Sequence, residues 1–177
     1  AVFPGTTSNH HLHHVAALAV TLAEMKKFGK AYARQTVANA KALARALHDE
    51  GFDVCCPDQG FTESHQVAMD VSELGDASKL AVQLEMANII VNKNLLPKDY
   101  VAHTKNPSGI RLGSQELTRL GMKQRDMEEI ADFFKRIIID KEKPEKIKGE
   151  IIEFKRQFQK VHYCFTQEFG AYEFPEL

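Results

Sequence analysis

The histidine-rich segment HHLHH, residues 10–14, contains spacings that could bind a metal ion. His10 and His14 are four residues apart and His10 and His13 are three apart, so two imidazoles could face one ion on a helix. Structural zinc sites take four ligands, and the neighbouring sequence supplies no third one. We therefore predict no metal site and interpret these histidines as polar residues at the start of a helix that lines a cleft. A zinc-binding module is the distant alternative.

The segment GTTSN, residues 5–9, could bind a phosphate. Small polar residues that lead into a helix present free backbone N–H groups and the positive end of the helix dipole. Ser8 or Asn9 would also be suitable caps for that helix. The local pattern leaves phosphate binding and simple capping equally open.

Arg111 lies in an apolar segment, with Ile110 and Leu112 beside it and glycines beyond. A guanidinium in such a strand needs a bidentate partner. If the partner is a protein carboxylate, the arginine is structural; otherwise it awaits the carboxylate or phosphate of a ligand. A third polar segment, Asn92–Asn94, follows an apolar run. Its amides could bind a polar heterocycle or form an Asx turn.

The apolar periodicities predict the elements that would position these residues. We expect a small α/β arrangement behind two alanine-rich helices, with a charged connector at 140–150. In order, the expected elements are helices at 12–28 and 33–47, strands at 52–56 and 65–71, a helix at 76–87, strands at 88–92 and 109–113, and helices at 127–138 and 151–161.

The composition of the 177 residues is that of a globular protein, with 44% hydrophobic and 27% charged residues and a formal net charge of −1. This balance indicates neither nucleic acid nor an anionic membrane as a partner. No apolar run reaches the roughly 20 residues of a membrane-spanning helix. The three cysteines, Cys55, Cys56 and Cys164, form no disulfide pattern and favour a cytoplasmic location. We interpret them as buried small hydrophobic residues rather than catalysts.

From residue 2 to 135 the segments occur in the order found in one family, and the chain resembles serine hydroxymethyltransferase, also called glycine hydroxymethyltransferase. The segments that carry the resemblance are FPGTTSNHHLHHVAALAV at 3–20, NAKALA at 39–44, SHQVAMDV at 64–71, VNKN at 91–94, SGIRLG at 108–113, LTRLGM at 117–122 and DMEEIA at 126–131.

The resemblance implies a pyridoxal-phosphate enzyme that transfers a one-carbon unit between serine and a tetrahydropterin, leaving glycine. It assigns Arg111 to the α-carboxylate of serine or glycine and Asn94 to the pterin, either tetrahydrofolate or tetrahydromethanopterin. In the family a Gly-Gly pair reaches across a homodimer interface to the cofactor phosphate. Here Ser8 and Asn9 stand at those positions, which keeps the backbone donors but adds side chains.

The resemblance also implies the fold class: α/β, with an α+β small domain that is the C-terminal domain of a fold-type-I pyridoxal-phosphate enzyme, preceded by long connecting helices. Residues 1–50 would be the end of the large cofactor domain and the connecting helices, and residues 51–177 the small domain. In the family the catalytic lysine lies upstream of the position of Ala1. We therefore expect a C-terminal fragment that is inactive alone. We also expect it to self-associate, because loss of the large domain would expose the apolar faces of residues 12–23 and 33–47.

Two alternatives remain open. Another fold-type-I pyridoxal-phosphate enzyme, such as an aldolase or an aminotransferase, would keep Arg111 but has no reason to keep the segment 91–94. A stand-alone binding or dimerisation module would lack catalysis altogether.

Overall fold

A computed structural model describes residues 3–100, 105–166 and 170–173. Its centre is a four-stranded sheet with the order β1-β2-β4-β3, in which every neighbouring pair is antiparallel. The strands are β1 (Asp53–Val54), β2 (Gln66–Asp70), β3 (Asn92–Asn94) and β4 (Gly109–Gly113). The expected strands at 65–71 and 109–113 are thereby confirmed, and β1 confirms the centre of the strand expected at 52–56.

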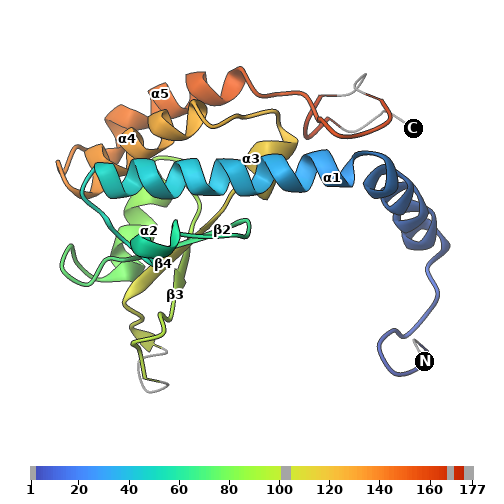
Figure 1. Ribbon diagram of the computed structural model, residues 1–177, viewed down its shortest axis with the longest axis horizontal. Helices are drawn as coiled ribbons and strands as arrows, with labels where there is room; N and C mark the ends of the chain where they lie inside the picture. The colour runs from blue at the N-terminus through green and yellow to red at the C-terminus, as the bar shows by residue number, and fades with distance from the viewer. Residues whose placement is uncertain (1–2, 101–104, 167–169, 174–177) are drawn as a thin grey trace.

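The helices pack against one face of this sheet (Figure 1). They are α1 (Leu12–Asp49), α2 (Ala77–Met86), α3 (Gln115–Arg119), α4 (Asp126–Ile138) and α5 (Pro144–Arg156), with a 3-10 turn, η1, at Pro57–Gln59. Between helices and sheet lies one hydrophobic core, in which Leu47, Met69, Ile110 and Met127 are fully buried. This core supports the sheet from the side of the helices.

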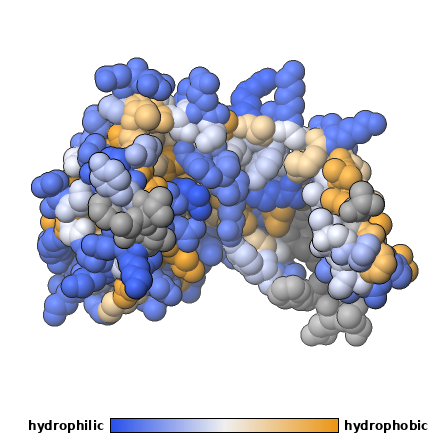
Figure 2. Space-filling view, turned by 90° about the horizontal axis from the view of Figure 1, so that it is seen from below, coloured by the Kyte–Doolittle hydropathy of each residue, from blue (hydrophilic) through white to orange (hydrophobic). Residues whose placement is uncertain are grey.

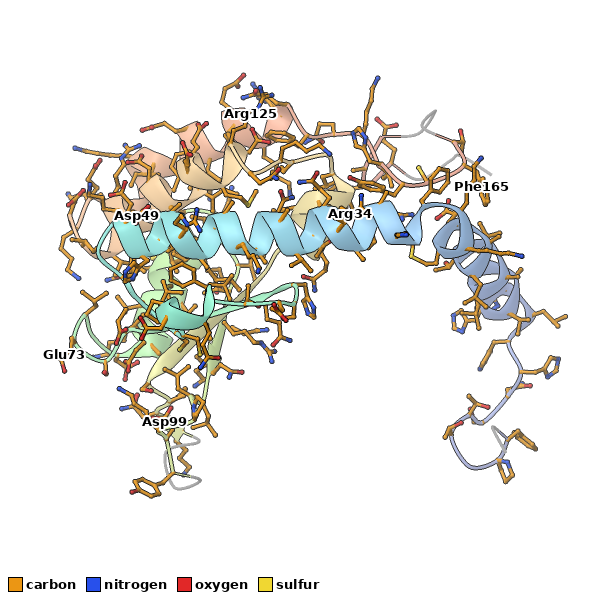
Figure 3. All side chains as sticks on the ribbon, viewed as in Figure 1. Arg34, Asp49, Glu73, Asp99, Arg125 and Phe165 are labelled. Atoms are coloured by element: carbon orange, nitrogen blue, oxygen red, sulfur yellow. The ribbon has the colours of Figure 1, made fainter. Side chains whose placement is uncertain are left out.

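The N-terminal region forms one helix, α1, where two were expected. The helix passes through Gly29 and bends in its N-terminal part (Figure 1). Glu24 accepts hydrogen bonds from the Arg119 guanidinium at 2.7 Å and from the Phe165 N–H at 3.2 Å. The rings of Phe28 and Phe165 lie 5.7 Å apart, beside the bend (Figure 3). These contacts brace the bent helix against the C-terminal segment.

The two ends of α1 differ in environment. Near its C-terminal end Leu43, Ala44 and Leu47 are buried in the core, whereas residues 12–23 are exposed. Hydrophobic residues therefore lie on the surface of the projecting arm, at the right of Figure 2. Such a surface is typical of a segment that packs against another domain or subunit.

The predicted helix caps are wrong. The residue before α1 is His11, with a left-handed φ of 35° and no side-chain cap. The Asn9 carboxamide instead accepts a hydrogen bond from the N–H of His10 at 2.8 Å. Because Ser8 and Asn9 lie three or more residues before the first helical residue, neither reaches the free N–H groups of the first turn.

Two other predicted boundaries are wrong. Residues 88–91 are not a strand, because the partner strand β4 pairs with Asn92–Asn94 instead. The charged connector is largely helical, since Pro144 occupies the first turn of α5, where proline is well tolerated. The helices expected at 76–87 and 127–138 are confirmed.

Candidate functional site

The face of the sheet opposite the helices carries the polar side chains. Side chains alternate along a strand, so Ile110 and Leu112 point into the core and Arg111 points away from it. Arg111 stands opposite Ala68 on β2 and Asn92 on β3. None of the described helices covers this face (Figure 1), and the larger lobe is mostly hydrophilic when seen from below (Figure 2).

The guanidinium of Arg111 has no protein partner within the described ranges. The residue is partly buried, yet it forms no hydrogen bond or ion pair with any described residue. A half-buried arginine is ordinarily paired, because its five N–H donors lose water on burial. The structural reading of this arginine, a salt bridge to a protein carboxylate, therefore finds no support among the described residues.

Asn94 lies on the same face as Arg111. It pairs with Gly109, two residues from Arg111 along β4, which makes it a diagonal neighbour of Arg111, at about 7–8 Å between backbones. Its Nδ2 donates to the Leu95 carbonyl at 2.6 Å, so the amide is oriented by the chain itself. The strand register thus places Arg111 and Asn94, two of the predicted site residues, side by side.

A loop borders this area at the Gly109 end. The Asp99 carboxylate accepts hydrogen bonds from the N–H groups of Leu96 at 2.9 Å and of Ser108 at 3.0 Å, which ties the two ends of the loop together. Leu96 packs over Gly109 so closely that a Cβ there would lie 2.6 Å from its side chain. Glycine is therefore required beside the site for steric reasons.

The same loop supplies Lys98, which forms an ion pair with Asp70 on β2. Burial raises the pKa of Asp70, but hydrogen bonds from Lys98 and Ser72 outweigh it, so the pKa lies below its ordinary value. Asp70 is thus ionised and already paired at neutral pH. It does not compete with a ligand for Arg111.

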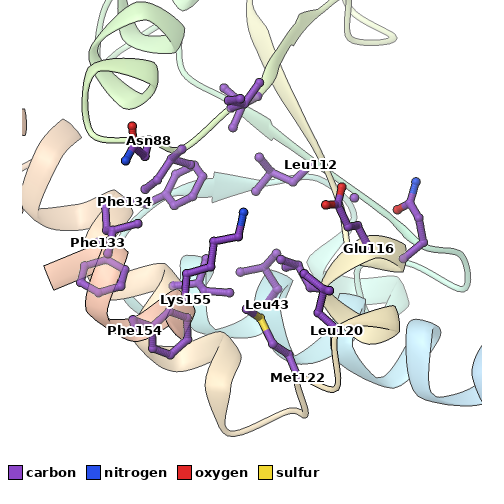
Figure 4. A pocket seen from close by; sticks show the side chains of 18 of the residues that line it. Leu43, Asn88, Leu112, Glu116, Leu120, Met122, Phe133, Phe134, Phe154 and Lys155 are labelled. Atoms are coloured by element: carbon purple, nitrogen blue, oxygen red, sulfur yellow. The ribbon is translucent and has the colours of Figure 1, made fainter. Parts of the chain in front are cut away.

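A groove of about 500 Å³ opens beside the end of β4, and Asn92, Arg111 and Gln115 are among the residues that line it (Figure 4). Its walls come from residues 88–92, α3 and the inner sides of α4 and α5, and they are mostly apolar, with Phe133, Phe134 and Phe154 on one side. Lys155 extends into its mouth (Figure 4). Arg111 borders the groove, but strand alternation directs its side chain to the face opposite Leu112.

Ser8 and Asn9 lie far from Arg111, beyond the N-terminal end of α1 (Figure 1). Both residues are exposed, and their backbone N–H groups donate to no described atom. The segment therefore retains the free donors that a phosphate requires, although the helix begins later than expected. The structure of this single chain does not bring it together with Arg111 and Asn94.

The histidine rings cluster without forming a metal centre. The rings of His13 and His14 lie 4.1 Å apart and those of His11 and His14 5.5 Å apart. No group of three or more histidine, cysteine or acidic side chains in the described part of the chain could hold a metal ion. None of the described helices is both long and apolar enough to cross a bilayer.

The adjacent cysteines were expected to be buried, and neither of them is. Cys55 is partly exposed, and Cys56 is exposed in a left-handed turn with φ of 59°. Burial raises the pKa of the Cys55 thiol, and the nearby Cys56 and Asp53 raise it further. Because the thiolate is the nucleophilic form, Cys55 is poorly suited to nucleophilic chemistry at neutral pH.

Residues 1–134 match the family model described as serine hydroxymethyltransferase. The chain belongs to the serine hydroxymethyltransferase family. It is 62% identical over 174 residues to the serine hydroxymethyltransferase of Methanocella arvoryzae, which covers 98% of this chain. It is 58% identical to that of Methanocaldococcus jannaschii over 96% of the chain and 57% identical to that of Staphylothermus marinus over 93%. The chain spans 41%, 40% and 37% of these family members, respectively.

Among solved structures, the chain resembles the L-threonine transaldolase from Pseudomonas fluorescens in its internal aldimine state. The TM-score is 0.81 and the identity 37%, over 93% of this chain and 37% of that one. The match confirms the fold class, the small α+β domain at the C-terminal end of a fold-type-I pyridoxal-phosphate enzyme. Within the serine hydroxymethyltransferase family, then, this chain corresponds to a part of the molecule.

The sequence indicates Asn92 only as one of the two amides of the segment Asn92–Asn94, and it predicts no role for Gln115. The signal for Asn92 was available, because residues two apart on a strand share a face. No comparable signal exists for Gln115, whose side chain lies over Gly113 because α3 begins two residues after that glycine.

Proposed function

We propose that this chain is the substrate-binding C-terminal part of a pyridoxal-phosphate-dependent serine hydroxymethyltransferase that interconverts serine and glycine. The observation that carries this proposal is the guanidinium of the partly buried residue Arg111, which lacks a protein partner among the described residues. Family membership and the names of the relatives support it. Because those relatives are more than twice as long, the activity belongs to a longer polypeptide.

Arg111 would bind the α-carboxylate of serine or glycine. The planar guanidinium offers two parallel N–H donors that match a carboxylate, and lysine cannot reproduce this geometry. A carboxylate held in two places fixes the orientation of the α-carbon and its remaining bonds. The rigid sheet below Arg111 makes that orientation reproducible.

Asn94 would bind the one-carbon carrier, a tetrahydropterin such as tetrahydrofolate or tetrahydromethanopterin. Its carboxamide nitrogen is engaged by the Leu95 carbonyl, which leaves the carboxamide oxygen as an acceptor for N–H groups of a heterocycle. Its place next to Arg111 would bring the carrier close to the bound amino acid.

Ser8 and Asn9 would hold the phosphate of pyridoxal phosphate through their backbone N–H groups, which fit an anion because they are exposed and donate to no described atom. When bound, this cofactor serves as the electron sink for bond cleavage at the amino acid. The lysine that holds it in this family would come from the preceding part of the longer polypeptide.

The distance of Ser8 and Asn9 from Arg111 suits a homodimer, in which they serve the site of the second subunit (Figure 1). The exposed apolar side chains on the arm support such an interface; they include Leu12, Val15, Leu18 and Leu22, each more than half exposed. Residues 1–50 would then be the end of the cofactor domain and the helical connection, and residues 51–177 would form the small domain of a cytoplasmic enzyme.

The test uses the full-length polypeptide that contains this chain, loaded with pyridoxal phosphate. Arg111→Lys should raise the KM for serine about 100-fold, because a bidentate contact becomes a single one. Arg125→Lys is the matched control, since the Arg125 side chain is 86% exposed and far from the sheet face (Figure 3). Unchanged affinity for serine in Arg111→Lys, or turnover of threonine in preference to serine, would contradict the proposal.

A further inference from the structure

The residues directly beside Arg111 along β4 and opposite it on β2 are very small. Its diagonal neighbours on β2 are Gln66, opposite Gly113, and Asp70, opposite Gly109 and engaged by Lys98 and Ser72. Gly109 and Gly113 occupy the positions two residues away on the same face of β4, and Ala68 stands opposite on β2. None of these can approach a guanidinium with a polar group. On the β3 side the opposite residue is Asn92, which is exposed.

A second carboxamide lies at the Gly113 end. A Cβ placed on Gly113 would lie 2.5 Å from Oε1 of Gln115, so this side chain covers the position that a residue at 113 would otherwise fill. Gly113 follows Arg111 by two residues, or about 7 Å along the strand. The Gln115 carboxamide therefore borders the same patch of the sheet.

Neither carboxamide is used to hold the fold together. The side chains of Asn92 and Gln115 form no hydrogen bond with any described residue; only the backbone carbonyl of Gln115 accepts one, from the Tyr32 hydroxyl at 3.0 Å. Two carboxamides and one guanidinium, all without described protein partners, thus border a floor of glycine and alanine.

We infer that Asn92 and Gln115 complete the Arg111 site as additional hydrogen-bond donors to the carboxylate of the bound amino acid. The inference rests on the proposed function and deepens it. A carboxylate accepts about four hydrogen bonds and a bidentate guanidinium supplies two of them. A carboxamide adds a donor without placing a second cation beside Arg111, so the site gains selectivity for a carboxylate without charge repulsion.

The experiment measures binding of glycine and of glycinamide, which lacks the carboxylate, by calorimetric titration of the full-length polypeptide loaded with its cofactor. Asn92→Ala and Gln115→Ala should each weaken glycine binding about tenfold, the usual effect of one hydrogen bond to a charged group. Binding of glycinamide should stay as in the unaltered protein. Gln83→Ala, at an exposed glutamine of α2, is the control and should change neither.

Asn92→Asp is a second variant with nearly unchanged shape. It replaces a donor with a negative charge that would pair with Arg111 and repel the ligand, so it should weaken glycine binding more than Asn92→Ala does. Glycine binding that is unchanged in these variants, while Arg111→Lys loses it, would overturn the inference and leave the proposed function standing. Equal losses for glycine and glycinamide would also overturn it, since they indicate a general distortion. Unchanged glycine binding in Arg111→Lys would instead overturn the proposed function.

Discussion

Ile110 and Arg111 are consecutive residues of one strand, but Ile110 is apolar and fully buried, whereas Arg111 is charged and only partly buried. Ile110 belongs to the face with Val67, Met69 and Leu112, all nine-tenths or more buried beneath the helices. Arg111 belongs to the face whose described side chains are mostly small or polar and partly open. One face therefore supplies folding stability and the other supplies binding groups, so substitutions on the two faces should have separable effects.

The largest effect is expected on the buried face. Ile110→Ala should lower the free energy of unfolding by about 3–4 kcal/mol, because a fully buried side chain is lost and the packed core cannot collapse around the cavity. Urea unfolding of the chain measures it. Arg111→Ala should change the same quantity by less than about 0.5 kcal/mol. Comparable losses in the two variants would contradict the division between the faces.

A smaller loss of stability is expected where the loop meets the polar face. In Gly109→Ala the new Cβ would lie 2.6 Å from the Leu96 side chain and 2.9 Å from the Asn94 carbonyl oxygen. The backbone oxygen cannot rotate away, so we expect a loss of about 1–3 kcal/mol. Gly149→Ala is the matched control: its Cβ would meet nothing within 4 Å on α5, and it should stabilise the helix by about 0.5–1 kcal/mol. Thermal unfolding of both variants decides the point.

A purely functional change is expected at Asn94. Asn94→Ala in the full-length polypeptide should weaken binding of the tetrahydropterin about tenfold, since one oriented hydrogen-bonding group is removed. Serine binding and the midpoint of urea unfolding should stay unchanged. Asn106→Ala, at an exposed asparagine outside the strands, serves as the control. A change in serine affinity equal to that in pterin affinity would show that the residue acts on the sheet as a whole.

The smallest effect is expected on the stability of the fold at acidic pH. Because the pKa of Asp70 is lower in the folded chain than its ordinary 3.8, the ionised form stabilises the fold. This contribution is fully present above the ordinary pKa and is lost as the pH falls through the lower, folded value. Asp70→Asn should therefore be slightly less stable than the unaltered chain at pH 6, and the difference should vanish toward pH 2. A difference in stability between Asp70→Asn and the unaltered chain that grows on acidification would contradict this prediction.

Much of the fold was predictable because local patterns and tertiary contacts agreed. In β2, Val67 and Met69 alternate with exposed or half-exposed neighbours, as they do in the sequence. Prediction was wrong where a single residue was given too much weight. The sequence predicts that a helix ends before Gly29, but the cost of glycine in a helix is only about 1 kcal/mol, and the packing of α1 outweighs it. The sequence also predicts a connector around Pro144, although proline readily starts a helix.

The prediction of a strand at 88–92 is wrong for another reason. Ile89, Ile90 and Val91 have high β propensity, but a strand needs a partner in register. The partner Gly109–Arg111 pairs with the polar residues Asn92–Asn94, and the apolar residues line the groove instead. In sheets the pairing, which is non-local, decides which part of a suitable segment becomes the strand.

Residue types and spacings within single segments were enough to predict the family and the two strands that carry the core. They were also enough to identify Arg111 and Asn94 as candidate binding groups. Tertiary structure alone decided that both side chains share one face, that Arg111 lacks a described partner, and that Gln115 and Leu96 border the same patch. The physical reason is that strand register and burial arise between segments far apart in the chain. A local pattern predicts which side chains alternate, but only the pairing of the strands determines which residues those side chains face.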